Sequence, residues 1–212
     1  MKKVFGIISY LPDKEPDRAQ RINRLERLFK QLFEFWPNIP IMVISQNWKT
    51  YVPDAKYNII NYAYGKLGII GARKTLRQRF LESEFDYLIM YDDDAIIECA
   101  TKESPKKYAE AIDNHPNGFM FLQYKSSPLN GCAISRAIYE KEPMVNIDAQ
   151  NNEGFEDDIF SWLLHNKYPE KEFVFNDIKC THFRNAAETA PSTWANEGKK
   201  EWLKLRSNTA AI

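Results

Sequence analysis

The sequence lacks the features that would mark a membrane-spanning, disulfide-rich or nucleic-acid-binding chain. Its N-terminal apolar run, VFGIISY at 4–10, is much shorter than the ~20 residues that a spanning helix needs. No small-residue cleavage site follows this run, so we interpret it as a strand and not as a signal peptide. Only three cysteines occur, without a CxxC motif, which favours a reduced, cytoplasmic compartment over a disulfide framework. The 29 basic residues balance 29 acidic ones, so no net charge points to nucleic acid or to an anionic membrane.

What is present is the pattern of one globular α/β domain. The 212 residues are 44% hydrophobic and 27% charged, which is an ordinary globular composition. Short apolar runs predict strands at 4–10, 39–45, 57–62, 86–91, 118–124, 131–135 and 172–177. Helical spacing and helix-start signals predict helices at 17–36, 104–115, 156–166 and 194–206, and a glycine-rich turn that leads into a basic helix at 68–83. This alternation predicts a Rossmann-like, mostly parallel central sheet with flanking helices.

Three adjacent aspartates follow the predicted strand at 86–91. Asp92, Asp93 and Asp94 interrupt the apolar sequence YLIMYDDDAIIE, although three neighbouring carboxylates repel one another by roughly 1 kcal/mol per close pair even in water. In open α/β sheets ligands gather at the carboxyl ends of strands, and hard oxygen ligands suit Mg²⁺ or Mn²⁺. An EF-hand loop is excluded because isoleucines occupy its fifth and sixth positions. A solvated acidic turn that merely closes the strand is the alternative.

The placement of these aspartates resembles a known family. A buried strand that ends in Asp-x-Asp, in an α/β domain that opens with a strand, is similar to the GT-A class of glycosyltransferases that use sugar nucleotides, and the resemblance extends over essentially the whole chain. It implies a GT-A-like single domain in which Asp92 and Asp94 hold Mn²⁺ or Mg²⁺ against the diphosphate of a nucleotide sugar, with a UDP-sugar as the first candidate. Asp93, between them, is then a donor-binding residue.

Other short stretches resemble the segments that bind the nucleotide-sugar donor in this class. The stretch GKLGIIGARKTL matches the glycine-rich segment and Ala-Arg that precede the metal motif, which implies that Arg73 reaches the nucleotide or its diphosphate. The chemistry of a guanidinium on a helix after a glycine-rich turn agrees with that role, although Arg73 could equally be a surface arginine. The end of the first strand implies nucleobase contacts from Ser9 and Tyr10, and the stretch NGCAIS implies that Gly131 lets the donor sugar approach closely.

The residues expected to bind and activate the acceptor are inferred mainly from the resemblance. The stretch NEGFEDDIF resembles the acidic motif of inverting members, in which one carboxylate deprotonates the acceptor hydroxyl. This implies Asp157 as the base, Glu156 as an acceptor-binding residue and Asp158 as the alternative base. Acidic residues in a first helical turn are favourable with the helix dipole in any protein, which is the structural alternative. In CTHFRN, His182 is expected in a loop after the last strand, where the resemblance implies a third metal ligand; a structural histidine is the alternative.

We therefore expect a nucleotide-sugar-binding half at 1–98, an acceptor and catalytic half at 99–193, and a C-terminal helix and tail at 194–212. The expected activity is an inverting, cytoplasmic glycosyltransferase of bacterial surface glycan synthesis. One alternative is a phage-type enzyme that glycosylates a hydroxymethylated DNA base, for which the basic residues of 73–79 would supply a local patch although the chain has no basic excess. A metal-dependent nucleotidyltransferase is a further alternative, but it would want a P-loop or a second strand with paired aspartates, and we find neither in the sequence.

Overall fold

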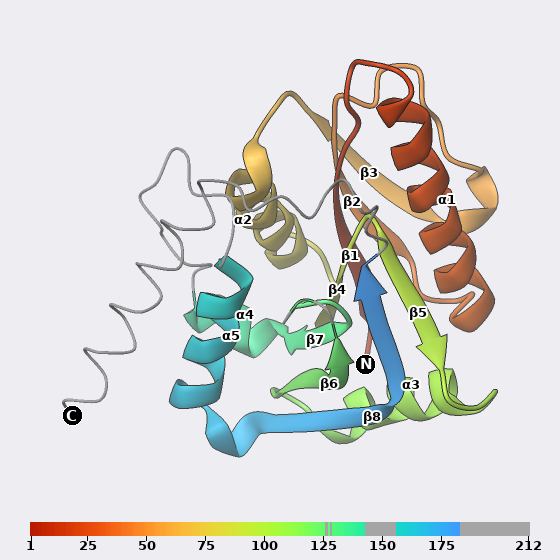
Figure 1. Ribbon diagram of the computed structural model, residues 1–212. Helices are drawn as coiled ribbons and strands as arrows, with labels where there is room; N and C mark the ends of the chain where they lie inside the picture. Colours follow the sequence, from red (N-terminus) through yellow and green to blue (C-terminus); the bar gives the residue numbers. More distant parts are fainter. Residues whose placement is uncertain (126, 128, 143–155, 183–212) are drawn as a thin grey trace.

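A computed structural model of the chain describes residues 1–125, 127, 129–142 and 156–182 (Figure 1). The strands are β1 (Lys3–Tyr10), β2 (Ile41–Gln46), β3 (Ile59–Tyr64), β4 (Tyr87–Asp92), β5 (Ala95–Cys99), β6 (Phe119–Lys125), β7 (Cys132–Ser135) and β8 (Glu172–His182). The α-helices are α1 (Asp17–Phe35), α2 (Gly68–Leu81), α3 (Ser104–Asn114), α4 (Arg136–Lys141) and α5 (Glu156–Lys167). Single turns of 3₁₀-helix, η1 (Ala55–Tyr57) and η2 (Pro169–Lys171), precede β3 and β8.

All of these strands join one mixed sheet in the order β3-β2-β1-β4-β7-β6-β8-β5. Strands β1 to β4 are parallel to their neighbours within this group, and β6 is parallel to β8. Strand β7 runs antiparallel to both β4 and β6, and β5 runs antiparallel to β8. The structure confirms the predicted class, a single α/β domain with a mostly parallel central sheet and flanking helices.

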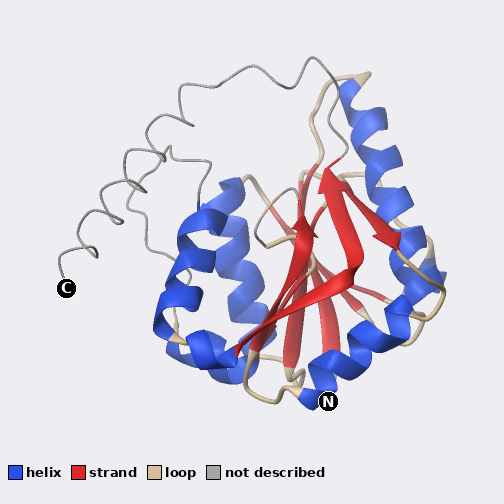
Figure 2. Ribbon diagram, turned by 60° about the horizontal axis from the view of Figure 1, so that its bottom comes forward, coloured by secondary structure: helices blue, strands red, loops and turns tan. Residues whose placement is uncertain are grey.

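Helices cover both faces of the sheet, and each face has its own core. Helices α1 and α3 lie on one face, and α2, α4 and α5 lie on the other (Figures 1 and 2). Their buried side chains belong to the two cores. In β4, Tyr87, Ile89 and Tyr91 belong to the first core, whereas Leu88 and Met90 belong to the second. A strand buried on both faces needs apolar residues at every position, which explains why the run before the aspartates shows no polar alternation.

The predicted elements are found with boundaries shifted by a few residues, but three details differ. Strand β5 and helix α4 were not predicted, because five and six residues are too few to show a period. Strand β8 continues to His182, whereas the predicted strand stops at 177. Helix α2 begins at Gly68, whose φ is 69°, so the stretch 68–83 contains no separate turn before the helix. The helix expected at 194–206 lies outside the described residues.

Two further observations concern the cysteines and the apolar length of the helices. Cys99, Cys132 and Cys180 are free thiols. None of the helices that the structure describes is long and apolar enough to cross a bilayer.

Candidate functional site

The strand order reverses direction between β1 and β4. From β1 the chain passes through α1 to β2 on one side, and it returns through α2 to β4 on the other side. Ligands of open α/β sheets bind outside the carboxyl ends of the strands at such a point. Strand β1 ends in Ser9 and Tyr10, β4 ends in Asp92, and the register places Ile8 opposite Asp92. Ser9 and Tyr10, the predicted nucleobase contacts, and Asp92, the first residue of the predicted metal motif, therefore lie together at the carboxyl ends of β1 and β4.

The pairing of β5 with β8, at the lateral edge of the sheet, brings His182 to the same place. After Asp92, two residues lead into β5, whose first residue, Ala95, pairs with His182 at the end of β8. The expectation that His182 lies in a loop after the last strand is wrong, since His182 is the last residue of that strand. Its position is fixed by sheet hydrogen bonding with β5, which the sequence analysis had not predicted.

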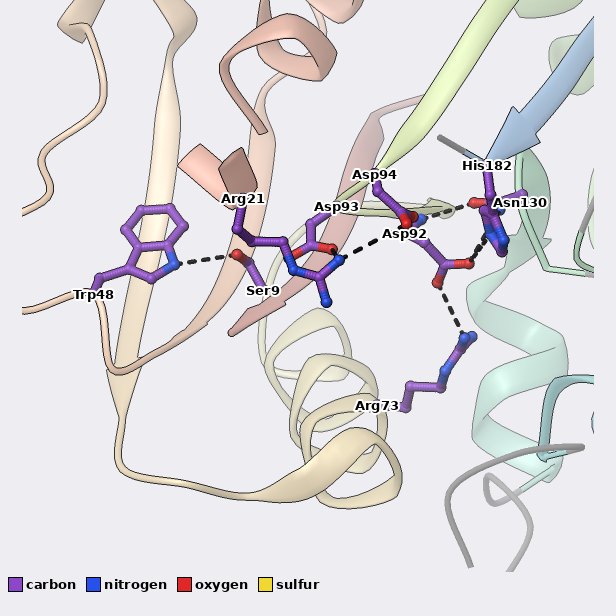
Figure 3. A network of polar contacts seen from close by, with 9 residues as sticks. All are labelled: Ser9, Arg21, Trp48, Arg73, Asp92, Asp93, Asp94, Asn130 and His182. Atoms are coloured by element: carbon purple, nitrogen blue, oxygen red, sulfur yellow. Dashed lines mark hydrogen bonds and ion pairs between the residues drawn. The ribbon is translucent and has the colours of Figure 1, made fainter. Parts of the chain in front are cut away.

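Asp92 is held by three side chains (Figure 3). Arg73 Nη2 donates to Asp92 Oδ1 at 3.2 Å, Asn130 Nδ2 donates to Oδ2 at 3.0 Å, and His182 Nε2 lies 2.7 Å from Oδ2. Asn130 Oδ1 also accepts the backbone N–H of Asp92 at 2.7 Å. Burial acts to raise the pKa of Asp92, but the hydrogen bond with His182 and the charge of Arg73 outweigh burial and lower this pKa below 3.8. The Asp92 carboxylate is therefore ionised and fixed in orientation.

Asp93 is the most enclosed of the three aspartates. It is 6% exposed, and Arg21 Nη1 lies 3.2 Å from its Oδ1. Its Oδ2 is buried and has no hydrogen-bond partner among the residues that the structure describes. Burial raises the pKa of Asp93 to about 6, with Arg21 and Ser9 acting in the opposite direction.

Asp94 lies in the fields of both Asp92 and His182. Burial raises the pKa of Asp94, the charge of His182 lowers it, and the charge of Asp92 raises it again. Arg21 Nη1 lies 3.7 Å from Asp94 Oδ2. Of the three expected metal ligands, Asp92 and His182 are in direct contact, and Asp94 lies close enough for their charges to shift its pKa. Within 1–125, 127, 129–142 and 156–182, however, no group of three or more His, Cys, Asp or Glu side chains is arranged so that it could hold a metal ion.

The expected donor-binding residues lie around this turn. Arg73, on α2, is 7% exposed and is directed at Asp92. Ser9 is 1% exposed and accepts a hydrogen bond from Trp48 Nε1 at 3.2 Å. Tyr10 lines a pocket of about 270 Å³ at the start of α1. The other residues around this pocket are Pro12, Asp17, Gln20, Arg21 and Arg24.

Gly131 has a structural reason to be glycine. Its φ is +69°, and a Cβ there would lie 2.3 Å from Leu122 Cδ1. The Tyr108 hydroxyl donates to its carbonyl oxygen at 2.8 Å. Backbone conformation and close packing therefore require a glycine at this turn, and contact with a donor sugar stays a prediction.

The expected acceptor-side residues lie at the start of α5. Glu156 and Asp157 begin α5, but their side chains lie outside the described part of the chain. Asp158 is partly buried in the first turn of α5. Their roles stay predictions.

The sequence analysis missed two residues of the site, Asn130 and Arg21. Asn130 joins Asp92 to His182. It stands directly before Gly131 and β7, the strand that pairs with β4, and this position is the signal that could have found it. Arg21 carries no comparable signal, because nothing local distinguishes it from the other arginines of α1.

Sequence comparisons give no relative: no family model and no curated protein matches the chain. Solved structures do match its fold. An S. aureus TarS structure in complex with UDP-GlcNAc aligns with a TM-score of 0.55 at 14% identity, covering 89% of this chain and 62% of that one. A Bacillus anthracis protein named as a glucose-1-phosphate thymidylyltransferase aligns at 0.54 and 12% identity, covering 85% and 89%. A glycosyltransferase involved in glycosylation of the major capsid of PBCV-1 aligns at 0.52 and 15% identity, covering 87% and 96%.

At these identities the likeness concerns the fold alone, and the chain spans 62% of the length of the TarS structure. The shared architecture is nevertheless specific, since it extends over at least 85% of the chain in each of the three alignments. The chain has a GT-A-like fold, which it shares with these neighbours.

Proposed function

We propose that this chain is a metal-dependent glycosyltransferase that transfers a sugar from a nucleotide-sugar donor to an acceptor hydroxyl. The observation that carries the proposal is the meeting of Asp92, Asp94, His182 and Arg73 at the carboxyl end of β4, within a GT-A-like fold. A UDP-sugar is the first donor candidate, because the TarS structure contains UDP-GlcNAc. A glycan of the bacterial surface is the proposed acceptor, and the cytoplasm is the proposed location of the enzyme.

The donor set fits a divalent cation chemically. Carboxylate oxygens and an imidazole nitrogen suit Mn²⁺ or Mg²⁺. The buried Oδ2 of Asp93 has no hydrogen-bond partner among the described residues, and burial raises the pKa of Asp94, so a nearby cation would stabilise the ionised form of both carboxylates. Asp92, Asp94 and His182 would hold this cation, and His182 Nε2 would give up its hydrogen bond to Asp92 in doing so. When bound, the cation would stabilise negative charge on the departing nucleoside diphosphate.

The protein's own residues would position the donor. Arg73 presents a buried guanidinium, whose fork geometry suits two phosphate oxygens. Asn130 orients Asp92 through the two hydrogen bonds that it forms with this residue. Ser9 and Tyr10 would contact the nucleobase, and Asp93 the remainder of the donor.

A nucleotidyltransferase is the second candidate, because the Bacillus anthracis neighbour is named as a thymidylyltransferase. A screen of UDP-, GDP-, CMP- and dTDP-sugars by thermal shift, with Mn²⁺ or with EDTA, tests both candidates, since a ligand of the native state raises the melting temperature. We expect a UDP-sugar to raise it in Mn²⁺ alone. A nucleotidyltransferase would also bind nucleotide sugars, because one of them is its product, so release of pyrophosphate from a nucleoside triphosphate and a sugar 1-phosphate is the result that would favour the second candidate.

The proposed inverting mechanism assigns the base to Asp157, with Glu156 binding the acceptor and Asp158 as the alternative base. Asp157→Asn removes the proton acceptor but keeps the side-chain shape, so transfer should fall by about 10²–10⁴ while donor affinity stays unchanged. If transfer collapses in Asp158→Asn instead, the base is Asp158. Normal turnover with a stability loss of about 0.3–1 kcal/mol would mean that Asp157 only interacts favourably with the helix dipole and is not the base. Retention of the anomeric configuration in the product, measured by NMR, would refute the inverting assignment.

A further inference from the structure

Two arginines flank the aspartate turn, and they come from helices on opposite faces of the sheet (Figure 3). Arg73 on α2 contacts Asp92, whereas Arg21 on α1 contacts the next two carboxylates. One nitrogen of Arg21, Nη1, lies 3.2 Å from Asp93 Oδ1 and 3.7 Å from Asp94 Oδ2. A single guanidinium is therefore shared between two adjacent carboxylates.

The surroundings make this shared charge important for the turn. The side chains of Asp93 and Asp94 are 8% and 17% exposed, so water screens their mutual repulsion poorly. Arg21 Nη1, within 4 Å of an oxygen of each carboxylate, thus supplies part of the positive charge that offsets this repulsion.

A divalent cation bound by Asp94 would supply the same charge at nearly the same place. The guanidinium and the cation would then lie a few Å apart, where like charges repel strongly. We propose that Arg21 is an internal counter-cation of the aspartate turn and competes with the divalent metal for Asp94. This inference rests on the proposed metal site and adds the residue that controls the affinity of that site.

The structure also offers the displaced side chain a second partner. Arg21 lines the pocket of about 270 Å³ together with Asp17, which is exposed and lies four residues earlier on the same helix. Side chains four residues apart on a helix face one another, and an acidic residue before a basic one is the favourable order. Arg21 can therefore exchange Asp94 for Asp17 by rotating about its own side-chain bonds, without a shift of α1.

Direct titration with Mn²⁺, followed by the EPR signal of the free ion without any donor, tests this competition. Arg21→Gln should tighten Mn²⁺ binding roughly tenfold, which corresponds to about 1.4 kcal/mol. Arg21→Lys keeps the charge and should remain close to wild type. Asp17→Asn removes the second partner and should weaken Mn²⁺ binding, which provides a test that does not alter the turn. Lys30→Gln is the matched control: it removes the same charge from the same helix at a side chain that is 67% exposed.

Unchanged or weaker Mn²⁺ binding by Arg21→Gln, with its circular dichroism spectrum intact, would overturn the proposal. Equal tightening in Lys30→Gln would assign the effect to net charge and would overturn it as well. If Arg21→Gln does not fold, unaltered binding by Asp17→Asn has the same consequence. If every variant binds Mn²⁺ with equal affinity, the role of Arg21 fails but the metal site stands. If neither the wild-type protein nor any variant binds Mn²⁺, the proposed metal site fails too.

Discussion

Adjacent aspartates of the same turn have opposite pKa shifts. Asp92 is surrounded by donors, and its pKa is lowered; Asp93 and Asp94 are dominated by burial, and their pKa values are raised. The sequence could predict that the cluster binds a ligand, because an acidic run after a buried strand is a local pattern. It could not predict the hydrogen bonds of Asn130, which lies 38 residues from Asp92, because only the sheet brings the two together.

The contrast between Asp92 and Asp94 predicts opposite effects on stability. Asp92→Asn removes the carboxylate that Arg73, which is 7% exposed, contacts at 3.2 Å, and it should cost about 3 kcal/mol. Asp94→Asn relieves like-charge repulsion and should be neutral or stabilising. Urea unfolding in EDTA at pH 7 measures both changes, since the free energy of unfolding then excludes any bound metal.

The dependence on pH provides the check on this prediction. The folded-state pKa of Asp92 is lowered, so its contribution is complete above 3.8 and is lost as the pH falls through the folded value. The folded-state pKa of Asp94 is raised, so its ionised form costs stability above that value, and the cost disappears as the pH falls below 3.8. The gap between the two variants should therefore be widest at pH 7 and close in acid. A gap that is independent of pH would contradict these assignments.

At the scale of elements, long periodic segments were predictable and short ones were not. Helix α1 has seven apolar residues at helical spacing across 17–36, and the structure places it at Asp17–Phe35. Strand β5 has five residues, and it is a strand because it pairs with β8, which lies far along the chain. The same pairing extends β8 to His182, so missing β5 and misplacing His182 have one physical cause.

The connection between β6 and β7 offers a test at this scale. Gly131→Ala forces a Cβ against Leu122 at a φ of +69°, so we expect a loss of about 1–3 kcal/mol from overpacking and backbone strain. The preceding residue, Asn130, should shift with the turn and loosen Asp92, which would weaken donor binding. Thermal unfolding and donor titration measure the two effects. Gly65→Ala is the matched control, because nothing lies within 4 Å of a Cβ at that glycine. Equal losses in the two variants would contradict the packing argument.

At the scale of the whole molecule, the site depends on how the sheet is connected. The comparisons match the fold at 12–15% identity, so the architecture persists where little of the sequence does. The short motifs could indicate a GT-A-like fold, but they could not show how the far edge of the sheet returns to β4. Asp92 and His182 stand 90 residues apart and meet because β5 leaves the aspartate turn and pairs with β8. The proposed division into halves at 98 and 193 stays a prediction.

This connection predicts that metal binding links distant strands. If His182 is a ligand, Mn²⁺ should slow amide hydrogen exchange both at the turn after β4 and at the end of β8, because one ion would hold both. His182→Ala should weaken Mn²⁺ binding by about tenfold or more. It should also abolish the protection of β8 while that of the turn persists at saturating metal. His165→Ala is the control, since its imidazole is 65% exposed on α5 and should change neither measurement. An unchanged Mn²⁺ titration in His182→Ala would leave this histidine the structural role of orienting Asp92, and the cation would then depend on the aspartates alone.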